Sequence, residues 1–136
     1  MANNKPIFVG EIYGKNVTLT DTTLTDIFVG DVSLCTRVDV IAITTDEASN
    51  QNIKLYFHDG TASRIASTLQ IPLGAGTTYN IPPLSVLAHT NMAPHVITDG
   101  AGNKFIDLPP GWKIQAQMSV LTGGKNVFVL TRGGTY

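Results

Sequence analysis

The sequence predicts an all-β fold: an antiparallel β-sandwich or jelly roll of about eight strands, with at most one short helical turn. Short segments alternate between apolar and polar side chains, and their β-branched content is high. Turn residues (Gly, Pro, Asn and Asp) separate these segments at intervals of roughly 8 to 15 residues. No segment keeps a helical period. From the length of the chain we expect one domain over residues 1–136, with a flexible N-terminal arm (about 1–5) and C-terminal tail (about 132–136).

Residues 48–71 carry the clearest pattern, two strands that turn back on each other at Asp59-Gly60. Apolar side chains occupy every second position of the first arm: Ile53, Leu55 and Phe57. A period of two is typical of a strand with one buried face. Asp-Gly suits a two-residue type I′ turn, in which both central residues have positive φ. The sequence therefore predicts a β-hairpin over this range.

Before this hairpin, the sequence predicts short strands in residues 6–13, 16–20 and 27–29, each ended by turn residues. Residues 32–45 form the longest apolar segment. Its apolar side chains fall on both faces of an extended chain, with Val38, Val40 and Ala42 on one face and Ile41 and Ile43 on the other. This pattern is typical of a central strand that is covered on both sides.

After the hairpin, we expect a short strand in residues 77–81 and one helical turn that begins at Pro83. An edge strand is expected in residues 105–108. Residues 112–121 alternate again, and a Gly-Gly turn separates them from the last apolar segment, residues 126–131. The sequence predicts that these two segments pair as a second hairpin.

The composition argues against several classes of function. Charged residues make up only 14% of the chain, hydrophobic residues make up 43%, and the formal net charge is −1. The surface must therefore consist largely of Thr, Ser, Asn and Gln, which suits broad protein contact. No run of Lys and Arg indicates nucleic-acid binding, and no apolar run reaches the roughly 20 residues of a membrane span. The start of the chain lacks the pattern of a secretory signal, so we expect synthesis and folding in a reducing cytosol.

The candidate metal ligands include three histidines, His58, His89 and His95. A site of His89, His95 and Asp99 would resemble a cupin, but this spacing fits no ligand rule and the His-x-His pair of cupins is missing. Three acids, Asp21, Asp26 and Asp31, are spaced by five residues, unlike the alternating ligands of an EF-hand. We expect them to be turn and cap residues, and we expect no metal and no cofactor.

The residues offer no catalytic site either. No serine has the G-x-S-x-G context, and no base accompanies Cys35, the only cysteine, which we expect to be a buried, inert thiol. Trp112 is in phase with Ile114, so we interpret it as a core or barrel-end residue rather than a platform for sugars. We expect no catalytic residue and no enzyme.

The order of several phrases is similar to that of a known group of proteins. LYFHDGTASR is followed by IPLGAGTT, then by PPLSVL, and then by DGAGNKFIDLPPGWKIQAQ. This order resembles small proteins of tailed bacteriophages that act as capsid cement (decoration) proteins or related virion components, and the resemblance covers roughly residues 38–129. It implies a jelly roll or related sandwich that binds the major capsid protein on the outer surface of the virion, as a dimer or trimer, after synthesis in the cytoplasm of the bacterial host.

The expected contacts of such a protein lie in three segments. They are the N-terminal arm, the loop of residues 84–95 and the C-terminal end, with the candidate residues Asn3, Lys5, Ile7, Phe8, Leu84, Val86, Met92, Pro94 and Tyr136. Two alternatives stay open. One is a carbohydrate-binding or tail-fibre (spike) module that would stack sugars on Tyr56, Tyr79 or Trp112, and the other is a small cupin-like enzyme.

Overall fold

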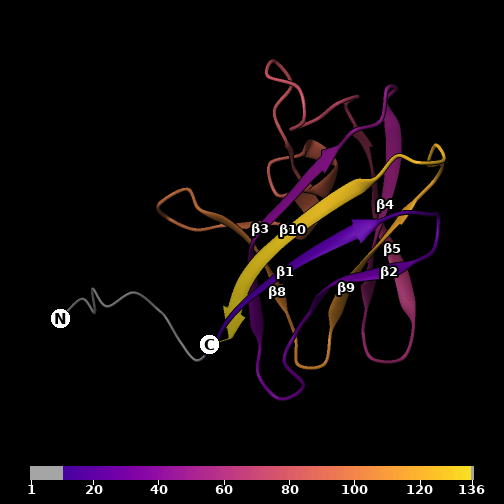
Figure 1. Cartoon of the computed structure of the whole chain (residues 1–136). Helices are drawn as coiled ribbons and strands as arrows, with labels where there is room; N and C mark the ends of the chain where they lie inside the picture. Colours follow the sequence, from indigo (N-terminus) through magenta and orange to yellow (C-terminus); the bar gives the residue numbers. More distant parts are fainter. Residues whose placement is uncertain (1–10, 136) are drawn as a thin grey trace.

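The computed structural model describes residues 11–135, which form two antiparallel sheets (Figure 1). Within this range there are ten strands and one short 3-10 helix. Their bounds are β1 (Ile12–Leu19), β2 (Thr25–Val29), β3 (Thr36–Thr45), β4 (Gln51–His58), β5 (Ser63–Ile71), β6 (Leu84–Ser85), η1 (Thr90–His95), β7 (Ile97–Thr98), β8 (Lys104–Leu108), β9 (Lys113–Met118) and β10 (Val127–Thr135). The predicted all-β class is confirmed.

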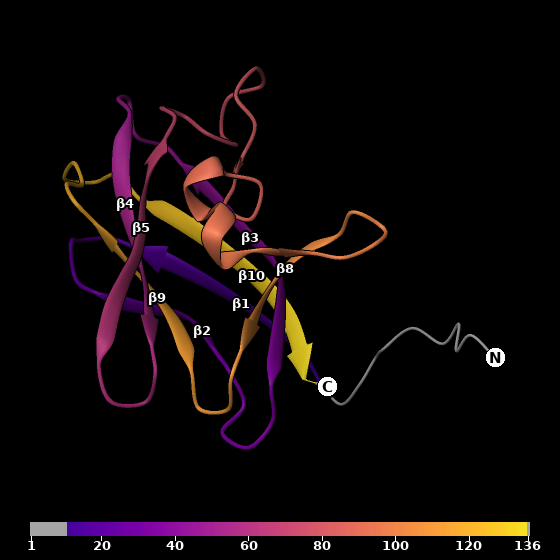
Figure 2. The same ribbon diagram turned by 180° about the vertical axis from the view of Figure 1, so that it is seen from behind.

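The strand order is that of a jelly roll (Figures 1 and 2). The six-stranded sheet has the order β1-β10-β3-β8-β7, with β6 also paired to β3, and the four-stranded sheet has the order β2-β9-β4-β5. The chain passes from one sheet to the other after β1, β2, β3, β5, β8 and β9, and it turns back within one sheet at β4–β5. Such alternation closes a double Greek key around one core. No helix in the described part of the chain is long and apolar enough to span a membrane.

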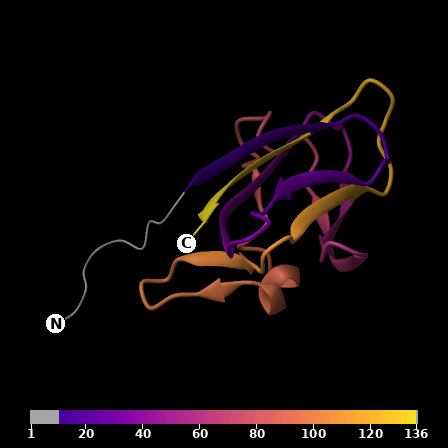
Figure 3. The same cartoon turned by 90° about the horizontal axis from the view of Figure 1, so that it is seen from below.

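The core lies between the two sheets. Figure 3 shows the molecule from below, with β1 and β10 running across the view. Each long strand contributes alternate side chains to the core, as in β10, where Val127, Val129 and Thr131 are buried. Helix η1 covers the side next to β5, where Asn91 Nδ2 donates a hydrogen bond of 3.0 Å to Thr68 O. Side chains that point inward therefore pack against the opposite sheet. Side chains that point outward from the same strands can contact solvent or a partner.

The apparent two-faced pattern of residues 32–45 comes from a β-bulge in β3. Opposite β10, Gly133 pairs with Val38 while Arg132 pairs with Val40, so Asp39 is an extra residue. The bulge reverses the alternation, because Val38 before it and Ile41 after it are both buried whereas Val40 is exposed. The prediction that this strand is covered on both sides is wrong for the position of Val40.

The predicted hairpin is present, but its turn is different. β4 and β5 pair from Gln51 opposite Ile71 to His58 opposite Ser63. Residues 59–62 form a four-residue turn in which Gly60 alone has positive φ, +94°, so the predicted type I′ turn is wrong. The Asp59 carboxylate instead accepts hydrogen bonds of 2.9 Å from the backbone N–H groups of Thr61 and Ala62, an Asx-type turn.

The predicted second hairpin does not form. β9 pairs with β2 and β4, whereas β10 lies between β1 and β3 in the other sheet, so residues 119–126 cross from one sheet to the other. The predicted C-terminal tail is also wrong for residues 132–135, which belong to β10. The chain stays paired there because Gly133 lets the two backbones approach. A Cβ atom at this position would lie 2.1 Å from Arg37 O.

Two smaller predictions also fail. Residues 77–81 form a turn with one isolated bridge, between Thr78 and Ile81, instead of a strand. The helical turn expected at Pro83 is replaced by the short strand β6, and the helical turn of the chain is η1, a few residues later. The N-terminal arm expected at residues 1–5 lies outside the described residues.

Candidate functional site

Of the contact residues predicted from the sequence, some are buried, some are accessible and the rest lie outside the described residues. Val86 and Met92 are buried in the core, so the prediction that they contact a partner is wrong. Apolar loop residues of a sandwich often cover the open sides of its core, and Met92 does so from η1. Leu84 is half-buried on β6, and Pro94 is exposed on η1. The remaining candidates, Asn3, Lys5, Ile7, Phe8 and Tyr136, lie outside the described residues.

The candidate site is the outer face of β1, β10 and β3. The cross-strand register places its side chains in three rows: Thr18–Phe128–Thr44, Asn16–Leu130–Ala42 and Gly14–Arg132–Val40. We call these nine residues the outer face. Eight of the nine are uncharged, and Phe128 is 39% exposed although it is a large aromatic residue. Figure 1 looks onto the three strands that carry this face.

Arg132 is the one charge among these nine residues, and it lies in the last row between Gly14 and Val40. Within the described residues its guanidinium has no ion pair and no side-chain hydrogen bond. Arginine and aromatic residues surrounded by uncharged groups are typical of the centres of protein interfaces. A partner surface that covers the outer face would have to desolvate only this one charge.

The outward side of the four-stranded sheet has the opposite character, since its polar groups bond to one another. The Asp26 carboxylate accepts hydrogen bonds of 3.0 Å from Lys113 Nζ and 2.8 Å from Gln115 Nε2. The Tyr56 hydroxyl donates to Gln117 Oε1 at 3.2 Å. This polar face is internally satisfied, whereas no side-chain hydrogen bond joins the described residues of the outer face. The outer face is therefore the better candidate for contact with another molecule.

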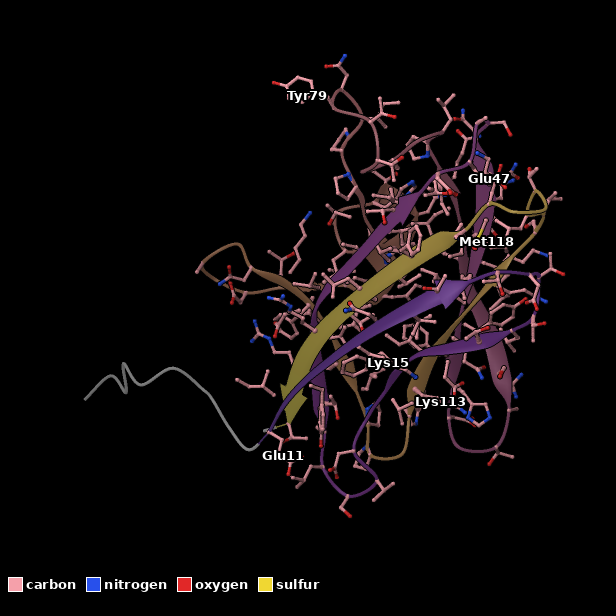
Figure 4. The ribbon with its side chains drawn as sticks, viewed as in Figure 1. Glu11, Lys15, Glu47, Tyr79, Lys113 and Met118 are labelled. Carbon is pink, nitrogen blue, oxygen red and sulfur yellow. The ribbon has the colours of Figure 1, made fainter. Side chains whose placement is uncertain are left out.

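Glu47 holds together the loops at one end of the sandwich (Figure 4). Its side chain is buried, with 2% of the residue exposed, and its carboxylate accepts hydrogen bonds from Thr122 N at 2.6 Å and Thr122 Oγ1 at 2.9 Å. Its backbone carbonyl accepts a hydrogen bond of 2.9 Å from Gly74 N. The loops after β3, β5 and β9 thus meet at one residue, and this shared residue fixes their relative positions.

The aspartates expected to act as turn and cap residues mostly do so. Backbone hydrogen bonds to Thr23 hold the pKa of Asp21 below its usual range, and those to Ser33 and Leu34 do the same for Asp31. Such bonds favour the charged carboxylate and fix the loop. Asp26 acts differently, as the ion-pair partner described above.

The pKa of Asp26 reflects its position between β2 and β9. Burial raises this pKa, but the hydrogen bonds from Gln115 and Lys113 and the positive charge of Lys113 outweigh burial, so the net pKa is lowered. On the neighbouring edge, burial and the acids Glu11 and Asp31 raise the pKa of Tyr13 to about 12. These ionisable groups are therefore held in the charge states that stabilise the fold at neutral pH.

The three histidines are each bonded to the backbone. His58 Nδ1 accepts from Gly60 N and His89 Nδ1 accepts from Asn91 N, both at 3.0 Å, while His95 Nε2 lies 3.2 Å from Ala66 O. Across residues 11–135, no group of three or more His, Cys, Asp or Glu side chains is placed to hold a metal ion. The cupin-like combination of two histidines and Asp99 does not come together as a site.

Two further predictions concern Cys35 and Trp112. Cys35 is exposed, so its prediction as a buried thiol is wrong. It lies in the turn directly before β3, where Leu34 is exposed as well. Trp112 is half-buried, packs against the core and has its ring 6.3 Å from that of Phe57, which agrees with its interpretation as a core residue.

The outer face was missed from the sequence because its residues come from three separate strands. Its signal is present as the set of outward apolar positions, Val40, Phe128 and Leu130, but these become neighbours only after β10 is placed between β1 and β3.

In comparisons with known proteins, no family model, no curated protein and no solved structure matches the chain.

Proposed function

We propose that this chain is a structural virion protein that binds the outer surface of a bacteriophage capsid and cements neighbouring major capsid subunits, without turnover. The observation that carries the proposal is the outer face of the jelly roll, a broad set of uncharged side chains around Phe128 and Arg132. The proposal also draws on the order of phrases that resembles phage cement proteins. Partners would be the major capsid protein and further copies of the chain.

The physical basis of cementing is added contact area between subunits of a lattice. A sheet face with few charges can be covered at low desolvation cost, and stable attachment needs roughly 800 Å² on each partner. One molecule that bridges two subunits holds them together, and a shell offers many equivalent sites for such bridges. Modest affinity at each site therefore adds up to a large stabilisation of the shell against expansion or heat. The outer face would supply the contact with one of the two bridged subunits.

The carbohydrate-binding alternative depends on exposed aromatic residues. Of the three candidates, Tyr79 is exposed, Tyr56 is half-buried with its hydroxyl bonded to Gln117, and Trp112 is half-buried against Phe57. The described residues do not gather these aromatics into a common platform. We therefore favour a protein partner, and we keep sugar binding as an outcome of the tests.

The test uses purified capsid shells of a tailed phage from which the decoration protein has been removed. The chain should co-sediment with the shells and raise the temperature at which they break open. Phe128→Glu should lower the affinity at least about 10-fold, because the new charge would be buried against the partner. If no shell binds the wild-type chain, the proposed function is wrong.

A matched control is Ile65→Glu. Ile65 is an exposed apolar residue on β5, an edge strand of the other sheet, so the substitution adds the same charge away from the outer face. This variant should bind shells as the wild type does. Equal losses for both variants would mean that the outer face has no special role in attachment.

A further inference from the structure

We infer that the loop of residues 72–83 is a preformed plug whose Tyr79 inserts into an uncharged pocket of a second protein subunit, next to the subunit that the outer face covers. This inference rests on the proposed function and adds the second contact that bridging two subunits requires. It is carried by the exposure of Tyr79, the hydrogen bonds at the base of the loop, and the direction in which the loop extends.

Tyr79 is the most exposed large apolar side chain of the described residues, with a relative exposure of 101%. Among the described residues, its ring makes no aromatic or cation-π contact and its hydroxyl makes no hydrogen bond. In this position the side chain does not stabilise the fold by burial, since its apolar surface stays in water. Tyrosines are, however, among the residues that contribute most to binding at protein interfaces.

The base of the loop is fixed to the body of the protein. Thr45 N donates to Ala75 O at 2.9 Å, and Thr77 Oγ1 donates to Thr45 O at 2.8 Å. Ala75 is fully buried. Gly76 has φ +74°, and a Cβ atom there would lie 2.4 Å from the side-chain methyl of Thr44, so the loop packs directly on the end of β3.

The tip of the loop is also hydrogen-bonded. Gly76 N donates to Ile81 O at 2.8 Å, and Ile81 N donates to Thr78 O at 3.1 Å, which closes a tight turn around Tyr79. Because this backbone is already ordered, it loses little conformational entropy when the side chain binds a partner. The loop therefore has the properties of an insertion element that is ordered before its partner arrives.

The chemistry of the loop favours a protein pocket over a sugar. Residues 72–83 contain no charged side chain and no histidine, so insertion would bury no charge. Sites that hold sugars combine aromatic faces with several polar groups that converge on a concave surface. Tyr79 instead stands at the outer tip of a projecting turn (Figure 4). A pocket with apolar walls and one polar group at its base would accept both the ring and the hydroxyl.

The direction of the loop places Tyr79 away from the outer face. The loop extends past the ends of the strands (Figures 1 and 4), whereas the outer face is directed to one side of the sheet. The two surfaces meet at Thr44, the residue that packs against Gly76. A molecule that lies with its outer face on one subunit would therefore present Tyr79 to the next subunit in the lattice.

The test compares Tyr79→Ala, Tyr79→Phe and the control Val32→Ala, a residue that is 83% exposed in the turn between β2 and β3. Binding is measured to intact capsid shells and to unassembled major capsid protein. On shells, Tyr79→Ala should weaken binding at least about 10-fold, Tyr79→Phe less, and Val32→Ala not at all. On unassembled subunits, all four chains should bind equally. The melting temperatures of the variants should equal that of the wild type.

The possible results separate this inference from the proposed function. If Tyr79→Ala binds shells as the wild type does while Phe128→Glu does not, the plug is wrong and the proposed function stands. If Tyr79→Ala binds unassembled subunits more weakly than the wild type, both surfaces contact one subunit and the inference is wrong. If the wild type binds purified host-cell polysaccharide and Tyr79→Ala does not, Tyr79 binds sugar. Failure of the wild type to bind any shell removes both proposals.

Discussion

Replacement of Glu47 by alanine should destabilise the whole sandwich, because its buried carboxylate joins the loop after β3 to the loop after β9. The substitution removes the acceptors of two hydrogen bonds, from Thr122 N at 2.6 Å and from Thr122 Oγ1 at 2.9 Å. Each hydrogen bond to a charged group contributes about 1.5 kcal/mol or more, so we expect a loss of about 3 kcal/mol in the free energy of unfolding. For a chain of 136 residues this corresponds to a fall in Tm of about 10 °C.

Calorimetry and urea unfolding measure this effect, and two further variants test its origin. Thr122→Val removes the hydroxyl but keeps the backbone donor, so it should cost about 1.5 kcal/mol, or about 5 °C. Glu47→Ala combined with Thr122→Val should cost less than the sum of the single variants, because both remove the same bond. A Glu47→Ala protein that melts within about 2 °C of the wild type would show that Glu47 does not hold these loops together.

Three other predictions follow from the described contacts. Gly133→Ala should cost at least about 3 kcal/mol in urea unfolding, since its Cβ would overlap the carbonyl oxygen of Arg37, and wild-type stability would contradict the bulge geometry. Because the pKa of Asp26 is lower in the folded state than in the unfolded state, its contribution to stability is present above about pH 4 and is lost as the pH falls through the folded pKa. Asp26→Asn should therefore reduce the slope of stability against pH in that acid range, and an unchanged slope would refute this assignment. Cys35, which is exposed, should react with a thiol reagent in the native protein, and reaction only after unfolding would contradict its placement.

The features that the sequence predicted well are local. The β4–β5 hairpin depends on alternation within residues 51–71 and on a nearby turn, so a single stretch of sequence contains its signal. The capping role of Asp31 is local as well, since its bonds reach residues 33 and 34. The class of fold follows from the number of such segments, and the structure confirms it.

The features that the sequence missed depend on partners that lie far apart in the chain. Alternation shows which residues of β9 and β10 share a face, but it does not show which strand lies beside each one. β10 pairs with β1 and β3, more than 80 residues away at every paired position, rather than with β9. The bulge at Asp39 and the outer face depend on the same long-range pairing. Burial of Val86 and Met92 likewise depends on how the loop folds over the core.

The central claim is that the outer face of β1, β10 and β3 binds the capsid. An electron cryo-microscopy reconstruction of phage shells mixed with the chain tests it most directly, since it shows which side of the sandwich lies on the lattice. We predict that Phe128 and Arg132 lie against a major capsid subunit and that the polar face around Asp26 is directed toward solvent. Shells without bound protein, or attachment through the polar face, would contradict the claim.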